Sequence, residues 1–119
     1  MAKVLAVDDS QSIRQMVELT LDDEDHEVTT AQDGLEALNM AKEEQFDVVI
    51  TDINMPNMDG FELIKNLRGL DNYKLTPILC LTTESGDAQK TRGREAGATG
   101  WIVKPFSAQK LITLVERVV

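Results

Sequence analysis

Short runs of branched aliphatic residues alternate along the chain with longer segments in which apolar residues recur every three or four positions. The short runs are the predicted strands, and they cover residues 3–7, 27–31, 47–51, 77–81 and 100–103. Strands that alternate with helices are typical of parallel sheets whose two faces are covered. We therefore expect an α/β fold in three layers, with five parallel strands.

The segments between these runs show the apolar stripes of amphipathic helices. The first stripe is Ile13, Met16, Val17, Thr20 and Leu21, and the last is Leu111, Leu114, Val115 and Val118. Two more helices are predicted to begin at Asp33 and Asp59, because each aspartate is followed by a glutamate three residues later. Residues 82–100 contain no Val, Ile, Leu, Met or aromatic residue, and Gly93 lies within the helix expected there. We expect this fourth helix to be the most mobile.

The composition adds limits on the class of protein. With 119 residues, 42% of them hydrophobic and 28% charged, the sequence predicts one globular domain over residues 1–119 and no attached output domain. The first apolar run is too short for a secretory or membrane segment, so we expect a cytoplasmic protein. The net charge of −9 opposes binding to nucleic acid or to an anionic membrane. Other proteins and a metal cation are the expected partners, and we expect a monomer.

The single cysteine and the single histidine are both expected to have structural rather than functional roles. Cys80 lies between Leu79 and Leu81, which predicts a thiol buried in a strand and excludes an intramolecular disulfide. His26 follows the acidic residues 22–25, and we expect it in a solvent-exposed turn rather than as a metal ligand.

Polar residues directly follow four of the predicted strands. They are Asp8 and Asp9, then Asp52 and Asn54, then Thr82, Thr83 and Glu84, and finally Lys104. Ligands of an open parallel sheet bind beyond the carboxyl ends of its strands, so these side chains should share one edge. Acidic loops and helix caps explain Asp8 and Asp9 taken alone. They do not explain the whole pattern of carboxylates, hydroxyls and a lysine.

This set of groups suits a divalent cation and an aspartate nucleophile. Three neighbouring carboxylates repel one another, and together with Lys104 they leave a formal charge of −2 that one divalent ion neutralises. Oxygen ligands at an open edge favour Mg²⁺, with Mn²⁺ able to substitute. Such an ion withdraws charge from a phosphoryl group, and a carboxylate attacks it to form an aspartyl phosphate. Asp52, which ends a buried strand, is the predicted acceptor.

At this point the residues show a resemblance. The segments that carry it are Val7-Asp8-Asp9-Ser10, Asp52-Ile53-Asn54-Met55-Pro56, Met58-Asp59-Gly60, Leu81-Thr82-Thr83-Glu84, Ala96-Gly97-Ala98 and Lys104-Pro105-Phe106. In this order, along the whole chain, they resemble the receiver domain of response regulators, in its CheY-like chemotaxis form. The resemblance implies a flavodoxin-like (βα)5 fold with the strand order 2-1-3-4-5 that flavodoxin and CheY share. Receivers also commonly have a cis peptide bond before the proline of Lys104-Pro105.

The resemblance further implies how the acidic residues act. Asp52 would accept a phosphoryl group from the phosphohistidine of a CheA-like sensor histidine kinase. Mg²⁺ would be held by Asp9, Asp52 and the backbone carbonyl of Asn54, with Asp8 acting directly or through a metal-bound water. The protein would then be a signalling phosphoacceptor that supports its own phosphotransfer and autodephosphorylation, rather than an enzyme acting on a separate substrate.

Other residues would read and end the signal. Thr82 and Lys104 would each bind a phosphoryl oxygen after phosphorylation, and Trp101 stands at the aromatic switch position where many CheY proteins have tyrosine. Partner binding would switch through the face around these three residues. Asn54 and Glu84 would tune dephosphorylation by aligning the attacking water.

Alternative functions fit the sequence less well. A Mg²⁺-dependent phosphohydrolase with an aspartate nucleophile usually has a second aspartate two residues further on, where this chain has Asn54. A flavodoxin needs a phosphate-binding loop after its first strand, where Asp8 and Asp9 would repel the phosphate. Within the receiver interpretation, the output stays open between binding to a flagellar motor switch protein or a phosphatase, a phosphate sink, and a phosphorelay intermediate.

Overall fold

The sheet has five parallel strands. The computed structural model describes residues 2–83 and 86–119, and its strands are β1 (Lys3–Val7), β2 (Glu27–Ala31), β3 (Val48–Asp52), β4 (Ile78–Thr82) and β5 (Gly100–Val103). Their order is β2-β1-β3-β4-β5, so the predicted flavodoxin-like topology is confirmed. Strands β3 and β4 both run one residue later than the hydrophobic pattern predicts. Asp52 is therefore still paired, with Leu81, and Thr82 with Val103.

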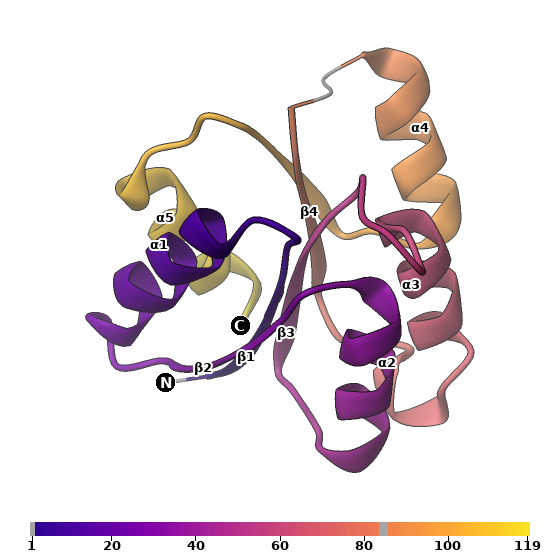
Figure 1. Cartoon of the computed structure of the whole chain (residues 1–119), viewed down its shortest axis with the longest axis horizontal. Helices are drawn as coiled ribbons and strands as arrows, with labels where there is room; N and C mark the ends of the chain where they lie inside the picture. Colours follow the sequence, from indigo (N-terminus) through magenta and orange to yellow (C-terminus); the bar gives the residue numbers. More distant parts are fainter. Residues whose placement is uncertain (1, 84–85) are drawn as a thin grey trace.

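Helices cover both faces of the sheet (Figure 1). Helices α1 (Gln11–Asp22) and α5 (Ala108–Val118) lie on one side, and α2 (Gly34–Glu43), α3 (Gly60–Arg68) and α4 (Asp87–Ala96) on the other, with a short 3-10 helix η1 (Asp71–Tyr73) before β4. The predicted helix starts are confirmed, since Asp33 accepts a hydrogen bond from the N–H of Glu36 and Asp59 from that of Glu62, both at 2.9 Å. None of the helices in the described ranges is long and apolar enough to cross a membrane.

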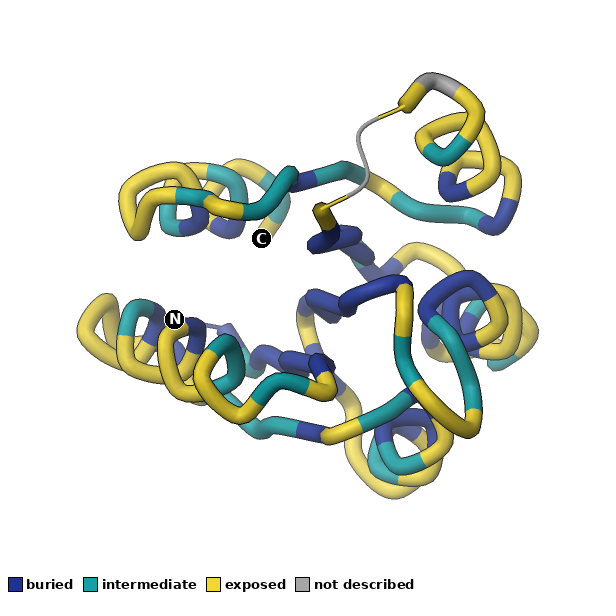
Figure 2. Tube along the Cα trace, turned by 45° about the horizontal axis from the view of Figure 1, so that its top comes forward, coloured by how far each residue is buried: buried dark blue, intermediate teal, exposed yellow. Residues whose placement is uncertain are grey.

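The core lies in two halves, one on each side of the sheet. Every residue of β3 and β4 is buried, whereas β2 at one edge is mostly half-buried. Figure 2 shows the buried positions along the strands and on the inward sides of the helices. Val17 and Leu21 bury the apolar stripe of α1, while Met16, which the stripe also contains, is 37% exposed. Cys80 lies in the buried strand β4 as predicted, and burial raises the pKa of its thiol to about 12.

The predicted exposure of His26 is wrong. The imidazole is only 5% exposed, and its Nδ1 accepts a hydrogen bond of 3.1 Å from the backbone N–H of Ala2. The cause is strand pairing, because Lys3 of β1 lies opposite Glu27 of β2 and this brings Ala2 next to the histidine. Its acidic neighbours in the sequence carry no information about this contact.

Candidate functional site

Three carboxylates and one lysine meet at the carboxyl ends of the strands. Asp8 follows β1, Asp52 is the last residue of β3, and Lys104 follows β5. Asp8, Asp9 and Asp52 each offer a carboxylate oxygen, and these atoms all lie within 4.8 Å of one another. The parallel topology thus brings together residues that are up to 96 positions apart in the sequence.

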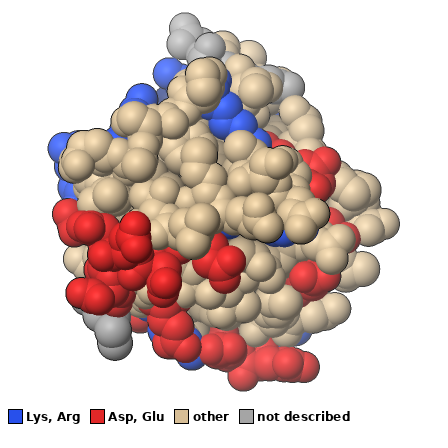
Figure 3. Space-filling model, turned by 60° about the vertical axis from the view of Figure 1, so that its left-hand side comes forward, with Lys and Arg blue, Asp and Glu red and all other residues tan. Residues whose placement is uncertain are grey.

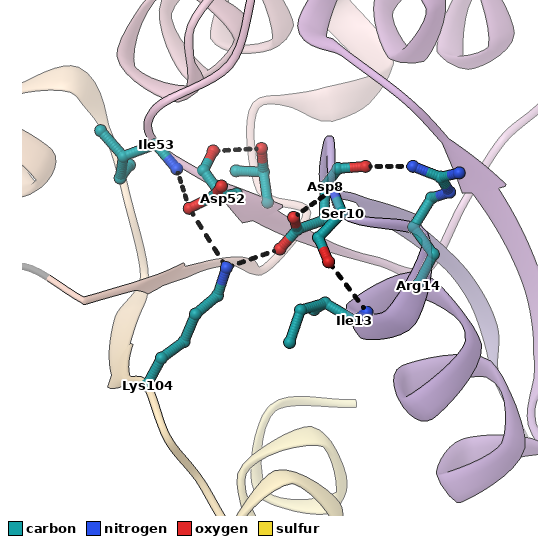
Figure 4. A network of polar contacts seen from close by, with 8 residues as sticks. Asp8, Ser10, Ile13, Arg14, Asp52, Ile53 and Lys104 are labelled. Atoms are coloured by element: carbon teal, nitrogen blue, oxygen red, sulfur yellow. Dashed lines mark hydrogen bonds and ion pairs between the residues drawn. The ribbon is translucent and has the colours of Figure 1, made fainter.

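Lys104 reaches across the site to two of the carboxylates (Figure 4). Its Nζ donates to Oδ2 of Asp8 at 2.8 Å and lies 3.6 Å from Oδ1 of Asp52. The backbone N–H of Lys104 donates to the carbonyl of Thr82 at 2.8 Å, which fixes the lysine to the end of β4. The peptide bond between Lys104 and Pro105 is cis, as the resemblance implies.

The turn after β1 is held by hydrogen bonds on both sides of Asp8. Oδ1 of Asp8 accepts from the N–H of Ser10 at 2.9 Å, and the carbonyl of Asp8 accepts from Nη1 of Arg14 at 2.8 Å. The Ser10 hydroxyl in turn caps α1 by accepting from the N–H of Ile13. Sequence reasoning missed Arg14, because no motif or spacing distinguishes it from an ordinary helix cation.

Asp52 is almost completely buried at the floor of the site. Its exposed fraction is 7%, and its Oδ1 accepts from the N–H of Ile53 at 2.8 Å. Burial raises the pKa of Asp52 to about 6, and the negative charge of Asp8 adds to the rise. The charge of Lys104 and the hydrogen bond from Ile53 act in the opposite direction.

The residues at this site fit a hard divalent cation. All three side chains offer only oxygen atoms, and two of them, those of Asp8 and Asp52, are buried. Lys104 supplies one positive charge against three carboxylates, which leaves a negative charge for a cation to neutralise. Oxygen ligands in an open, partly hydrated position suit Mg²⁺. The donor set therefore agrees with the metal that the sequence predicts.

The loop after Asp52 is packed too closely for any side chain at Gly60. A Cβ built there would lie 2.3 Å from the carbonyl oxygen of Asp52 and 2.8 Å from Cα of Ile53, while the Gly60 N–H donates to the carbonyl of Ile53. The loop is also tied to α2, because Nδ2 of Asn57 donates to Oδ2 of Asp33 at 2.8 Å. The Asp-Gly pair indicated a helix start, but not this contact with the backbone of the predicted acceptor.

The remaining predicted residues lie around the same edge or next to it. Thr82 is 1% exposed at the end of β4, one residue beyond the partner of Asp52 in the sheet. Asn54 is exposed in the following loop, and Trp101 in β5 is half-buried opposite Cys80. Glu84 lies outside the described residues.

Comparison with known proteins agrees with this geometry. Residues 4–116 match the response regulator receiver domain family. Chemotaxis protein CheY-3 of Vibrio cholerae is 41% identical over 98% of this chain and 90% of its own length. The structure of Vibrio cholerae CheY4 superimposes with a TM-score of 0.97, at 56% identity over 100% of this chain and 99% of that one. The receiver domain of sensor histidine kinase PA1611 from Pseudomonas aeruginosa is 25% identical, with a TM-score of 0.92 over 98% of this chain and 96% of that one, and it has a magnesium ion coordinated in its active site cleft.

The chain belongs to the response regulator receiver family. Within this family its similarity is to chemotaxis proteins of the CheY type, which are signalling phosphoacceptors phosphorylated on an aspartate. Receiver domains bind Mg²⁺ at an acidic cluster that corresponds to Asp8, Asp9 and Asp52.

Proposed function

We propose that this protein is a chemotaxis response regulator that accepts a phosphoryl group on Asp52 from a phosphohistidine of a sensor histidine kinase. The observation that carries the proposal is the position of Asp52, a buried carboxylate with a raised pKa, between two further carboxylates and Lys104. Asp8 is also buried next to Lys104, but it follows its strand, whereas Asp52 is itself the last residue of a strand that is buried along its whole length.

The geometry suggests the following transfer. Oδ1 of Asp52 is occupied by Ile53 and Lys104, so we assign the attack on phosphorus to Oδ2. As the Oδ2–P bond forms, the P–N bond of the phosphohistidine breaks and its electron pair returns to the imidazole. The ammonium group of Lys104 then leaves the Asp8 carboxylate and pairs with a phosphoryl oxygen, and the Thr82 hydroxyl donates a hydrogen bond to a second phosphoryl oxygen. Asp9, Asp52 and the backbone carbonyl of Asn54 would hold Mg²⁺, with Asp8 acting directly or through a metal-bound water. The ion would withdraw charge from the phosphoryl oxygens, and Mn²⁺ would be able to replace it.

Incubation with acetyl phosphate and Mg²⁺ tests the acceptor. Intact-mass spectrometry should show one added phosphoryl group, because one carboxylate is placed to attack. Asp52→Asn should show none, and EDTA should prevent labelling of the parent. Asp71→Asn is the matched control, since it removes a surface carboxylate at the opposite end of the sheet and should label fully. Undiminished labelling of Asp52→Asn, or of the parent in EDTA, would refute the assignment.

Autodephosphorylation is the proposed end of the signal. Asn54 lies two residues beyond Asp52 in the sequence, and we propose that it aligns the attacking water together with Glu84. A radiolabel chase with Mg²⁺ should therefore show loss of phosphate within seconds to minutes, and Asn54→Ala should change that rate. Label that persists for hours in the parent would rule out this role.

The proposed output surface comprises α4, β5 and α5, around Thr82, Trp101 and Lys104. Residues 88–119 contain six of the twelve Lys and Arg residues and only two of the twenty-one Asp and Glu residues. On the face seen in Figure 3, acidic side chains gather in the lower part and basic ones mostly in the upper part. This segment is thus positively charged in an acidic protein, which favours partners that bring negative charge.

Activation should distinguish the possible outputs. A regulator of the flagellar motor should gain a motor switch protein in a pull-down when beryllofluoride and Mg²⁺ mimic the phosphoryl group, because only then do Thr82 and Lys104 have their new partner. A phosphate sink or a phosphorelay intermediate should retain only the kinase or the next phosphotransfer protein. Asp52→Asn is the control, and an identical set of partners with and without beryllofluoride would contradict a switched output surface.

A further inference from the structure

Helix α4 brings very little of its own to the core. Its buried positions among those described are Gly93 and Ala96. The Arg92 guanidinium lies 4.3 Å from the centre of the Phe61 ring of α3, which adds a contact at the side of the helix. With so little apolar surface on the helix itself, its packing depends on side chains that reach it from neighbouring elements.

The indole of Trp101 is such a side chain. A Cβ added to Gly93 would lie 2.7 Å from Cζ3 of the indole, closer than real Cβ atoms approach, and 3.2 Å from Cε3, which is a tight contact. The six-membered ring therefore lies directly against the backbone of α4. It does so at the turn where the helix ends, since the carbonyl of Gly93 accepts from the N–H of Gly97 at 3.1 Å and from that of Ala98 at 2.9 Å.

The backbone conformation at position 93 does not require a glycine. Gly93 lies inside α4, where alanine is the more favourable residue. Among the glycines in the part of the chain that the structure describes, the left-handed conformation that favours glycine occurs at Gly97, which ends the helix with a φ of 115°. The close approach of the indole is the feature that a side chain at position 93 would exclude.

We propose that Gly93 is a positioning residue that seats the Trp101 indole on α4, and that the seated indole, together with Ala96, holds the C-terminal half of α4 on the molecule. The proposal rests on the proposed function in placing Trp101 on the output surface. Turning the indole away then loosens α4, so the aromatic side chain and the helix change together. We call this contact between the Trp101 indole and the backbone at Gly93 the indole seat. Trp101 also lines a shallow hollow of about 190 Å³ on the output surface, together with Lys90 and Arg94.

Tryptophan emission gives the first test, on the unphosphorylated protein without metal. Trp101 is the only tryptophan. Gly93→Ala should shift its emission, because the new methyl group displaces the ring. Gly86→Ala is the matched control at the start of the same helix, where a Cβ meets nothing within 4 Å, and its emission should equal that of the parent. Unchanged emission in Gly93→Ala would refute the proposed contact between the Trp101 indole and Gly93.

Amide hydrogen exchange of α4, followed by NMR, tests whether the Trp101 indole keeps the C-terminal half of the helix packed on the molecule. Trp101→Ala should speed exchange of the amides of residues 93–96 roughly fivefold in the parent, and less than about twofold in the Gly93→Ala background, where the indole seat is already blocked. Equal acceleration in both backgrounds would overturn the proposal. No phosphoryl donor is present in either experiment, so their failure would leave the assignment of Asp52 untouched, and the labelling experiment can fail without affecting them.

Discussion

Replacing Asp52 with asparagine is expected to stabilise the metal-free protein by about 1–2 kcal/mol at pH 8. The pKa of Asp52 rises from 3.8 to about 6 on folding, so the ionised carboxylate is less favourable in the folded state than in the unfolded one. The full shift corresponds to about 3 kcal/mol, and solvent at this open edge screens it to the smaller value. Asparagine keeps the acceptor for the Ile53 N–H without the charge. Urea unfolding of the two proteins in EDTA measures the difference.

The pH dependence has a definite sign. A raised folded-state pKa means that Asp52 adds stability when protonated, fully below about pH 4, and that this stability is lost as the pH rises through about 6. The gap between parent and Asp52→Asn should therefore open between pH 4 and pH 7 and close in acid. Saturating Mg²⁺ should stabilise the parent at pH 8 much more than the variant, because the variant has lost a ligand. Equal stabilities at pH 8 in EDTA, or a gap that persists below pH 4, would show that burial of this carboxylate is not unfavourable.

Gly60→Ala is expected to destabilise the protein by about 2–3 kcal/mol and to slow phosphorylation of Asp52. The new Cβ would lie 2.3 Å from the carbonyl oxygen of Asp52 and 2.8 Å from Cα of Ile53, and these backbone atoms cannot move aside as a flexible side chain would. The strand end that carries the acceptor must therefore move. Thermal unfolding and the rate of labelling by acetyl phosphate measure the two effects.

Gly86→Ala is the matched control for this substitution. It makes the same chemical change at the N-cap of α4, where the added Cβ has open space and only the poorer capping by alanine counts, so it should destabilise the protein by about 1 kcal/mol or less. If Gly60→Ala proved as stable as Gly86→Ala and were phosphorylated at the same rate, the close packing of the loop after Asp52 would have no energetic importance.

The features that the sequence predicted correctly depend on local pattern or on topology. Asp33 and Asp59 cap their helices through residues only three positions away, and this distance is fixed within any helix. The meeting of Asp8, Asp52 and Lys104 follows once parallel strands are recognised, because their carboxyl ends must share an edge. Neither inference needs the positions of individual atoms.

The features that were missed depend on contacts between distant segments. His26 is buried by Ala2, a residue 24 positions away, and Arg14 acts through a backbone carbonyl, which no side-chain motif records. Gly93 was predicted only as a weak point in a helix, because a missing side chain does not reveal which neighbour occupies the space. Such contacts are set by the packing of the whole fold rather than by any one segment.

The burial of the two strands that carry Asp52 and Thr82 determines how a signal can leave the site. Strands β3 and β4 are buried along their whole length, so the acceptor is mounted on the stiffest part of the molecule. These two strands would be expected to move little when a phosphoryl group is added to Asp52. Any displacement that the proposed phosphorylation causes would therefore be expected at the edge strand β5 and the helix beside it, where the structure is less buried than at its centre.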